Sequence, residues 1–126
     1  NSGIGKATAT LLAQQGHVTL MACRSKAACD AAADEVRAVA RGARVLPVGG
    51  LDLASLAATR AWATTLAEQL KAQLGEGARL DYLFNNAGVM PVGAAMTADG
   101  IELGLGVSYV GPLALGRWLL EAGVLT

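Results

Sequence analysis

The sequence alternates between helical and strand patterns along most of its length. Alanine-rich stretches with apolar residues at helical spacing are separated by short apolar runs, which are bounded by glycine or polar residues. This alternation is typical of a parallel sheet with helices on both faces, so we predict an α/β fold with a doubly wound parallel sheet. The predicted helices are Lys6–Gln15, Lys26–Ala40, Ser55–Leu74 and Asp99–Leu120, and the predicted strands are His17–Cys23, Arg44–Val48 and Leu80–Phe84.

Length and composition fit one globular domain with a buried core. The chain has 126 residues, of which 53% are hydrophobic and 16% charged, with ten basic and ten acidic residues. These charges are interspersed, and no basic stripe indicates a nucleic-acid partner. The uncharged run Leu103–Gly116 is shorter than the roughly 20 apolar residues of a spanning helix. We therefore predict a buried helix there and no membrane span.

The cysteines and the single histidine do not form a metal-binding pattern. Cys23 and Cys29 lack the spacing of metal ligands, and His17 does not supplement them. We expect no metal site, and we expect two reduced, buried thiols in a cytoplasmic protein. No signal peptide is visible, although the sequence is compatible with an anchor or targeting signal outside residues 1–126.

A glycine-containing segment runs directly into the first predicted helix. In Asn1-Ser2-Gly3-Ile4-Gly5 the glycines would let the backbone approach a pyrophosphate, and the N–H groups and positive dipole at the start of the helix would bind the anion. Glycine pairs before helices also occur in purely structural turns. The interpretation is strengthened by the strand ends, because ligands of parallel sheets bind beyond the carboxyl ends of the strands. Those ends are Cys23-Arg24-Ser25, Gly50-Leu51-Asp52-Leu53 and Asn85-Asn86-Ala87-Gly88.

Together these segments resemble the short-chain dehydrogenase/reductase family. The segment Asn1–Gly5 is similar to the end of the family's Thr-Gly-x-x-x-Gly-x-Gly loop. Asn85–Gly88 matches its Asn-Asn-Ala-Gly motif, and Leu51–Leu53 resembles its Asp-Leu segment beside the adenine. Met21–Arg24 and Leu83–Met90 are most similar to the retinol-dehydrogenase-like branch.

The resemblance extends from residue 1 to about Leu120 and has consequences for the fold. It implies that residues 1–126 are a partial NAD(P)-binding Rossmann domain, incomplete because the first strand and the C-terminal half are missing. Since the first strand is central in such sheets, its neighbours would lose hydrogen-bond partners. We therefore expect the isolated chain to be poorly stable.

The resemblance also implies roles in cofactor binding. The backbone N–H groups of Gly3 and Ile4 would face the pyrophosphate, and Gly5 would allow close packing of helix and strand. Asp52 would hydrogen-bond the adenine amino group beside the backbone of Leu53, although a carboxylate at this position could instead cap the following helix. The remaining residues of this group, Asn86, Ala87 and Gly88, would line the cofactor near its ribose.

Three residues bear on the choice of cofactor. After the predicted strand His17–Cys23 the sequence continues with Arg24 and Ser25, where NAD-binding relatives carry an acid. A guanidinium binds phosphate through charge-assisted hydrogen bonds, so we expect NADP rather than NAD. The alternatives are a solvated arginine at position 24 and use of NAD, because Ser2 stands where many NADP-preferring relatives carry a second basic residue.

The family's catalytic residues are mostly outside this sequence. The family uses a Tyr-x-x-x-Lys pair in which the lysine lowers the pKa of the tyrosine, but Asn86 follows Tyr82 at that spacing and Leu113 follows Tyr109. Ser108 takes the place of the family's catalytic asparagine. Ser108 is thus the single candidate catalytic residue.

We therefore predict the cofactor-binding fragment of an NAD(P)(H)-dependent short-chain oxidoreductase. The parent protein would transfer hydride to or from a carbonyl or alcohol carbon, with a small lipophilic substrate implied by the resemblance. The alternatives are a non-catalytic dinucleotide-binding module or pseudoenzyme and an interaction protein without cofactor. By analogy with the family, the parent could form a homodimer or homotetramer.

Overall fold

The computed structural model describes all 126 residues, Asn1–Thr126, and these form two compact units. The N-terminal unit is Asn1–Leu51 and the C-terminal unit is Asp52–Thr126. The mixture of helices and parallel strands is an incomplete Rossmann-like α/β fold, as the sequence predicts. The assignment of residues 1–126 to one partial domain stays a prediction.

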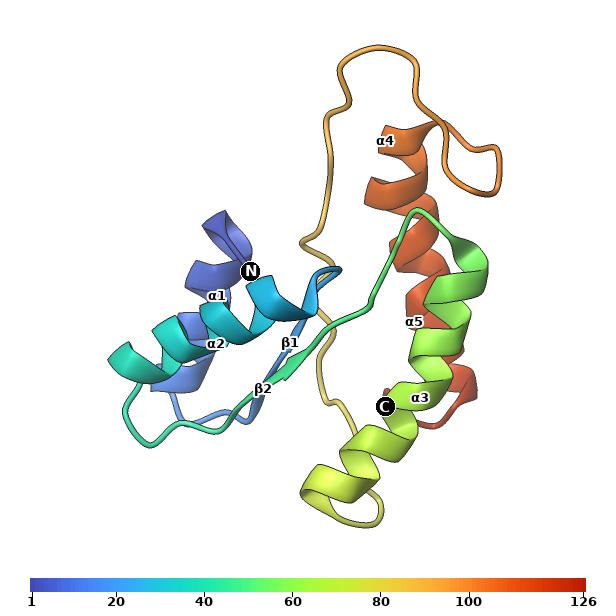
Figure 1. The fold of residues 1–126 in the computed structure, drawn as a ribbon. Coiled ribbons are helices and arrows are strands. Elements are labelled where there is room, and N and C mark those ends of the chain that lie inside the picture. Colours follow the sequence, from blue (N-terminus) through green and yellow to red (C-terminus); the bar gives the residue numbers. More distant parts are fainter. The chain divides into compact units, whose positions relative to one another are not determined.

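The N-terminal unit contains two helices and a two-stranded parallel sheet (Figure 1). Its sheet pairs β1 with β2 in the register Thr19↔Val45 to Ala22↔Val48. Because α2 connects two parallel strands, the segment is a βαβ unit of the kind that builds such folds. The elements are α1 (Gly3–Gln14), β1 (Thr19–Ala22), α2 (Lys26–Val39) and β2 (Val45–Val48), within a few residues of the predicted ranges.

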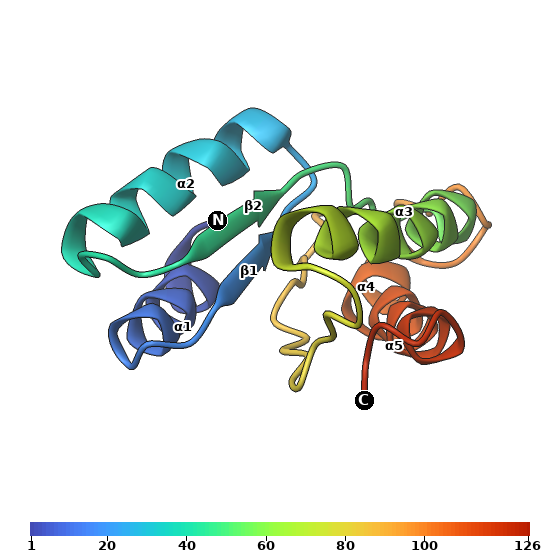
Figure 2. The ribbon, with the colours of Figure 1, turned by 90° about the horizontal axis from the view of Figure 1, so that it is seen from below.

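Small side chains form much of the core of this unit. Helix α2 packs on both strands and on α1, and the alanines at these contacts let the backbones approach closely. Figure 2 shows the two helices beside the two strands of this unit. The buried cluster comprises Ala9, Ala13, Met21, Cys23, Cys29, Ala32, Ala33, Val36, Ala40 and Val45.

The two cysteines are buried, but the prediction of free thiols is wrong. Cys23 and Cys29 are joined in a disulfide, and no free cysteine is present. Cys23 follows β1, and Cys29 lies one turn into α2. Their Cα atoms are 5.6 Å apart, within the roughly 4.4–6.8 Å that a disulfide spans. Sequence spacing does not reveal this approach, which the turn between strand and helix creates.

The C-terminal unit is mainly helical. Helix α3 (Leu56–Leu74) packs against α5 (Gly111–Glu121), and the large side chains Leu66 and Leu119 are almost completely buried between these elements. At the start of α5 the backbone comes very close to the loop before α3, because a Cβ on Gly111 would lie 2.7 Å from the carbonyl oxygen of Leu53.

The predicted third strand, Leu80–Phe84, is wrong. Leu80 forms only an isolated parallel bridge with Leu125, in which the N–H of Leu80 donates to the carbonyl of Val124. Residues 81–84 have no strand beside them. The apolar pattern is that of a strand, but a strand is stable only when its backbone groups find a partner.

The predicted last helix starts later than Asp99. Gly100 has a φ of +73°, which interrupts a right-handed helix, and the carboxylate of Asp99 instead accepts from the N–H of Leu56 at 2.8 Å. The helical stretch begins with α4 (Leu103–Leu105) and continues through the π-helical turn η1 (Gly106–Val110) into α5.

The continuous helical stretch Leu103–Glu121 is long and apolar enough to cross a membrane by length and composition. This is weak evidence, because core helices of soluble proteins have the same properties. The prediction of a buried helix holds for one face only. Leu115 is buried against the core, whereas Leu105, Tyr109 and Leu113 are exposed.

Candidate functional site

The start of α1 presents unpaired backbone donors. The helix begins at Gly3, three residues earlier than predicted, because the N–H of Lys6 donates to the carbonyl of Ser2 and closes the first turn. The Ser2 side chain makes no cap hydrogen bond, and the N–H groups of Gly3, Ile4 and Gly5 have no acceptor. A helix start with free amides and a positive dipole can bind an anion.

Gly3 shows why the sequence needs glycine here. Its φ is +52°, a left-handed conformation that side chains with a branched Cβ strongly disfavour. No atom lies within 4 Å of the position that its Cβ would take. A larger residue would therefore be opposed by backbone strain and not by a clash within the chain. This geometry fits the predicted approach to a phosphate group.

The carboxyl ends of β1 and β2 lie side by side. Backbone hydrogen bonding between the two segments continues past the strands. The N–H of Leu51 donates to the carbonyl of Cys23 at 3.1 Å, and the N–H of Gly50 donates to the carbonyl of Arg24 at 3.2 Å. Within the N-terminal unit, the structure thus brings the predicted segment Cys23–Ser25 beside Gly50 and Leu51, the first two residues of a second predicted segment. Because α1 runs antiparallel to β1 (Figure 1), its free N-terminus lies toward this same end of the sheet.

Arg24 and Ser25 occupy the turn from β1 into α2. Both are exposed. The Ser25 hydroxyl caps α2 by accepting from the N–H of Ala28 at 3.3 Å. Arg24 makes no hydrogen bond or ion pair through its guanidinium, so its five donors are available to a ligand.

Gly49 is a residue of this region that the sequence analysis did not single out. A Cβ at position 49 would lie 2.5 Å from both Cα and Cβ of Lys26, at the first turn of α2. Real Cβ atoms do not approach so closely, so only glycine lets the end of β2 pass α2. The Gly49-Gly50 pair and the helix Lys26–Ala40 were both visible in the sequence, but their close approach was not.

In the C-terminal unit, Asp52 and Leu53 form a local turn. The Asp52 carboxylate accepts from the N–H of Ala54 at 3.0 Å, and its backbone carbonyl accepts from the Thr59 hydroxyl at 2.8 Å. The cap of α3 is supplied by Ser55, whose hydroxyl accepts from Ala58. Asp52 therefore keeps one carboxylate oxygen that no protein donor uses.

The Asn-Asn-Ala-Gly segment lies next to Ser108. The Ser108 hydroxyl accepts from the N–H of Val89 at 3.3 Å, and a Cβ on Gly88 would lie 3.3 Å from the same oxygen. The candidate catalytic residue and this loop are thus brought together, although they are twenty positions apart. Ser108 lies within the π-helical turn η1, a feature that is frequent at functional sites. Asn86 and Ala87 are exposed beside it.

Gly106, in the same turn, also has a packing role. A Cβ at this position would overlap the methyl group of Thr97, which is buried and whose hydroxyl accepts from the N–H groups of Asp99 and Ile101 at 3.2 Å. The glycine therefore makes room for a buried threonine that orders the preceding turn.

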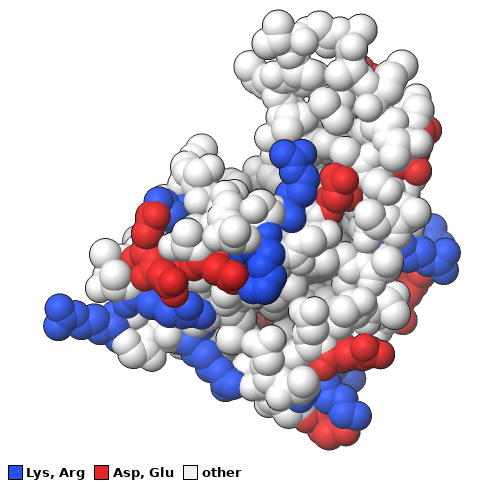
Figure 3. Space-filling view, in the orientation of Figure 1, with Lys and Arg blue, Asp and Glu red and all other residues white.

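The segment that begins with the Asn-Asn-Ala-Gly motif is uncharged, largely apolar and mostly exposed. Residues 85–98 contain no Lys, Arg, Asp or Glu, and the upper part of Figure 3 is correspondingly almost free of charge. The most exposed large side chains here are Met90, Val92 and Met96. Such a surface favours apolar ligands.

Glu102 holds the start of α4. Its carboxylate accepts from the N–H of Gly104 at 2.9 Å and from the N–H of Leu105 at 2.8 Å. These two hydrogen bonds lower the pKa of Glu102 below its usual value, because they stabilise the charged form.

Two other features do not coincide with the predicted site. A groove of about 580 Å³ between α3 and α5 is lined by Arg60, Trp118 and five other residues, none of which was predicted to bind cofactor. No group of three or more His, Cys, Asp or Glu side chains could hold a metal ion.

The family is shown by comparison with known proteins. The family model for short chain dehydrogenases matches residues 1–121. The chain therefore belongs to the short-chain dehydrogenase/reductase family, whose members are NAD(P)-binding oxidoreductases.

Its curated relatives include retinol dehydrogenases. The chain is 42% identical to mouse retinol dehydrogenase 11 over 96% of its own length and 36% of that protein. It is 40% identical to human retinol dehydrogenase 13 (96% and 34%) and 42% identical to human dehydrogenase/reductase SDR family member 13 (95% and 29%). The chain thus spans about a third of the length of these relatives.

Solved structures agree with this assignment. An uncharacterized protein from Mycobacterium paratuberculosis has a TM-score of 0.76 at 34% identity, with 99% of this chain and 40% of that chain covered. A short-chain dehydrogenase/reductase from Mycobacterium marinum has a TM-score of 0.70 at 25% identity, with 95% and 44% covered.

Proposed function

We propose that this chain binds NADP(H) and supplies the dinucleotide-binding part of an oxidoreductase that transfers hydride to or from a carbonyl or alcohol carbon. The observation that carries the proposal is the start of α1. There the N–H groups of Gly3, Ile4 and Gly5 are unpaired, whereas Ser25 and Ser55 cap α2 and α3. Three free amides at a helix start suit a pyrophosphate. When bound, the nicotinamide supplies the hydride chemistry.

The preference for NADP rests on Arg24. Its unpaired, exposed guanidinium stands at the carboxyl end of β1, at the same sheet end as the start of α1. A 2′-phosphate would receive charge-assisted hydrogen bonds there, and Ser25 would add a hydroxyl. Asp52 has one carboxylate oxygen left to accept from an adenine amino group, with Leu53 beside it.

A lipophilic substrate is supported by the surface that follows Asn86, Ala87 and Gly88. Met90 and Val92 are almost fully exposed to solvent, which is costly for apolar side chains unless a ligand or another part of the protein covers them. Several relatives carry the name retinol dehydrogenase, and retinol is a lipophilic alcohol. We propose a substrate of that general class.

Ser108 is proposed to position the loop that faces the cofactor. Its hydroxyl holds the amide of Val89, and so it fixes the backbone just after Gly88. The second candidate function is a dinucleotide-binding module without catalysis. It is favoured by the structural hydrogen bond that Ser108 accepts at the position of the family's catalytic asparagine.

A fluorescence titration with NADPH and NADH tests the binding proposal on the full-length protein. Arg24→Ala should weaken NADPH binding by roughly tenfold to a hundredfold, because hydrogen bonds to a charged group are lost, and should change NADH binding far less. Gly3→Val should weaken both. Arg41→Ala, which removes another exposed arginine of the N-terminal unit, is the control and should change neither.

Equal losses for NADPH and NADH in Arg24→Ala would contradict NADP preference, and binding unaffected by Gly3→Val would contradict the phosphate site. Turnover separates the two candidate functions. Consumption of NADPH with long-chain aldehydes supports the enzyme, whereas tight NADPH binding without turnover supports the module.

A further inference from the structure

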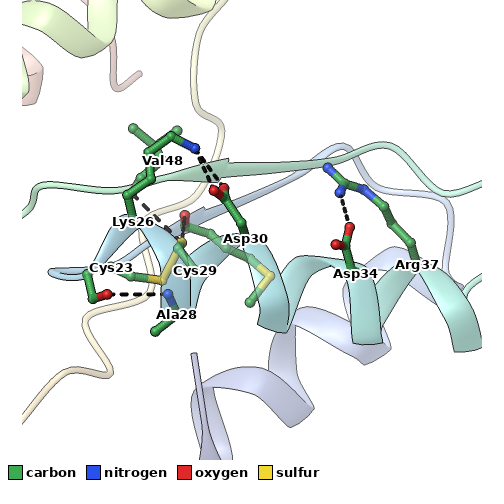
Figure 4. Close-up of polar contacts among 10 residues, drawn as sticks. Cys23, Lys26, Ala28, Cys29, Asp30, Asp34, Arg37 and Val48 are labelled. Atoms are coloured by element: carbon green, nitrogen blue, oxygen red, sulfur yellow. Dashed lines mark hydrogen bonds and ion pairs between the residues drawn. A yellow bond between two sulfur atoms is a disulfide. The ribbon is translucent and has the colours of Figure 1, made fainter.

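The Cys23–Cys29 disulfide encloses the two residues proposed to select the cofactor. Cys23 directly follows β1, and Arg24 and Ser25 come next. Cys29 lies in the first turn of α2, the helix that Ser25 caps. Figure 4 shows the disulfide at the start of α2, close to the cap contact of Ala28. The cross-link therefore ties the strand end to the helix on either side of the proposed phosphate-binding segment.

The surroundings of Cys29 accommodate the reduced state as well. Its Sγ atom lies 3.0 Å from the carbonyl oxygen of Met21 and 3.9 Å from that of Val48. A disulfide sulfur has no proton to donate, but a thiol at the same place would donate to Met21. A Cys29 thiol would therefore keep an acceptor after reduction. The two unbonded sulfurs would move apart, because they can no longer stay at bonding distance.

The disulfide contributes little as a global cross-link. It joins residues only six positions apart, and short loops restrict the unfolded chain less than long ones. The chain also has no other cysteine, unlike the disulfide-dense small domains of secreted proteins. Its main physical effect is local, on the segment between the two sulfurs.

We propose that Cys23 and Cys29 are a reversible thiol–disulfide pair that sets the affinity of the Arg24–Ser25 segment for the 2′-phosphate of NADP(H). This inference rests on the proposed function, because it regulates the same site. The oxidised form holds Arg24 and Ser25 between two fixed points, so less backbone freedom is lost when the phosphate binds.

The exchange partner is a low-molecular-weight disulfide such as glutathione disulfide. Cys23, which is 6% exposed while Cys29 is 0% exposed, attacks as thiolate and forms a mixed disulfide, releasing one glutathione thiolate. The Cys29 thiolate then attacks the Cys23 sulfur and releases the second. Two electrons pass from the cysteines to glutathione disulfide, and the two cysteine protons end on the two glutathione thiols that are released. Glutathione reverses both steps.

Linkage between the two equilibria gives a reciprocal effect. If the oxidised form binds NADPH more tightly, bound NADPH must favour the oxidised form by the same factor. NADH lacks the 2′-phosphate and does not engage Arg24 through it. It should therefore show neither effect to a comparable extent.

The test is made on the full-length protein equilibrated in glutathione buffers of different ratio. Peptide mass spectrometry measures the Cys23–Cys29 disulfide, and fluorescence titration measures binding. The oxidised protein should bind NADPH about tenfold more tightly than the reduced protein, which is the factor expected when roughly one residue's backbone is ordered in advance. Saturating NADPH should shift the thiol–disulfide equilibrium by the same factor. NADH should change both quantities by less than about twofold.

Two single-cysteine variants test the proposal separately, so that a folding defect in one of them does not decide the result. Cys29→Ala and Cys23→Ser should each bind NADPH with an affinity that no longer depends on the glutathione ratio. Thermal unfolding of each variant verifies that it is folded. Arg24→Ala in the otherwise unchanged protein should keep the disulfide but lose the difference in NADPH affinity.

The outcomes separate this inference from the proposed function. Two free thiols at every glutathione ratio, or equal NADPH affinity of oxidised and reduced protein, would overturn the inference while NADPH binding stands. Absence of NADPH binding in both states would overturn the proposed function and the inference built on it, even with the disulfide formed.

Discussion

The two units of this chain differ in how closely they follow their sequence patterns. In the N-terminal unit every predicted helix and strand forms within a few residues of its expected range. In the C-terminal unit α3 forms as predicted, but the apolar run Leu80–Phe84 remains without a strand beside it. The difference teaches that an apolar strand pattern is sufficient only when a partner strand is available. β1 has β2, whereas residues 81–84 have no such neighbour.

The largest expected difference between the units is in amide hydrogen exchange. The N–H groups of Thr19 and Cys23 donate to Arg44 and Val48 at 2.9 and 3.0 Å, whereas those of residues 82–84 donate no backbone hydrogen bond. We expect the first two to exchange at least roughly a hundredfold more slowly, because they open only when the sheet opens. Comparable protection of residues 82–84 would show that a strand forms there in solution. The two units would then not differ in strand formation.

Substitution of one glycine in each unit compares how closely the backbone is packed in the two units. Gly49→Ala in the N-terminal unit should lower the free energy of unfolding by about 1–3 kcal/mol, because its Cβ would overlap Lys26. Gly116→Ala, in α5 of the C-terminal unit, is the matched control. Its Cβ would meet only Leu83 at an ordinary 3.7 Å, so we expect stabilisation by about 0.5–1 kcal/mol from helix propensity. Urea denaturation measures both, and equal effects would refute the close approach at Gly49.

The helix caps provide a smaller comparison. Ser25→Ala should destabilise the N-terminal unit by about 1 kcal/mol, since Ser25 is the side chain that caps α2. Ser55→Ala should cost less, because Asp99 also accepts from the first turn of α3 through Leu56. Denaturant midpoints of the two variants check the order. A larger loss for Ser55→Ala would mean that the contact with Asp99 does not support the helix.

The smallest expected effect is the pH dependence due to Glu102. Because its pKa is lowered in the folded chain by the N–H groups of Gly104 and Leu105, its stabilising contribution is present above the usual glutamate pKa. That contribution is lost as pH falls through the lowered value. Glu102→Gln should slightly reduce the loss of unfolding free energy at acid pH. Near neutral pH the dependence of that free energy on pH should not change. Glu68→Gln, at an exposed position, is the control and should leave the curve unchanged.

Much of the candidate site could be predicted from the sequence because its signals are local. Gly3, Arg24 and Ser25 stand at the ends of elements whose patterns are clear, and the resemblance to the family predicted roles for them. Residues such as Gly49 and the Cys23–Cys29 pair could not be assigned in this way. Their importance depends on how closely α2 approaches the strand ends.

By itself, the sequence determined the family, the alternation of helices and strands in the N-terminal unit, and the residues at the ends of those elements, because each depends on short-range patterns of apolar, glycine and capping residues. The tertiary structure alone decided that Leu80–Phe84 lacks a partner strand, that Ser108 holds the amide of Val89, and that the cysteines are joined. These features require groups distant in space or separated by a turn to meet, and no local pattern specifies where a hydrogen-bond partner or a second sulfur will be.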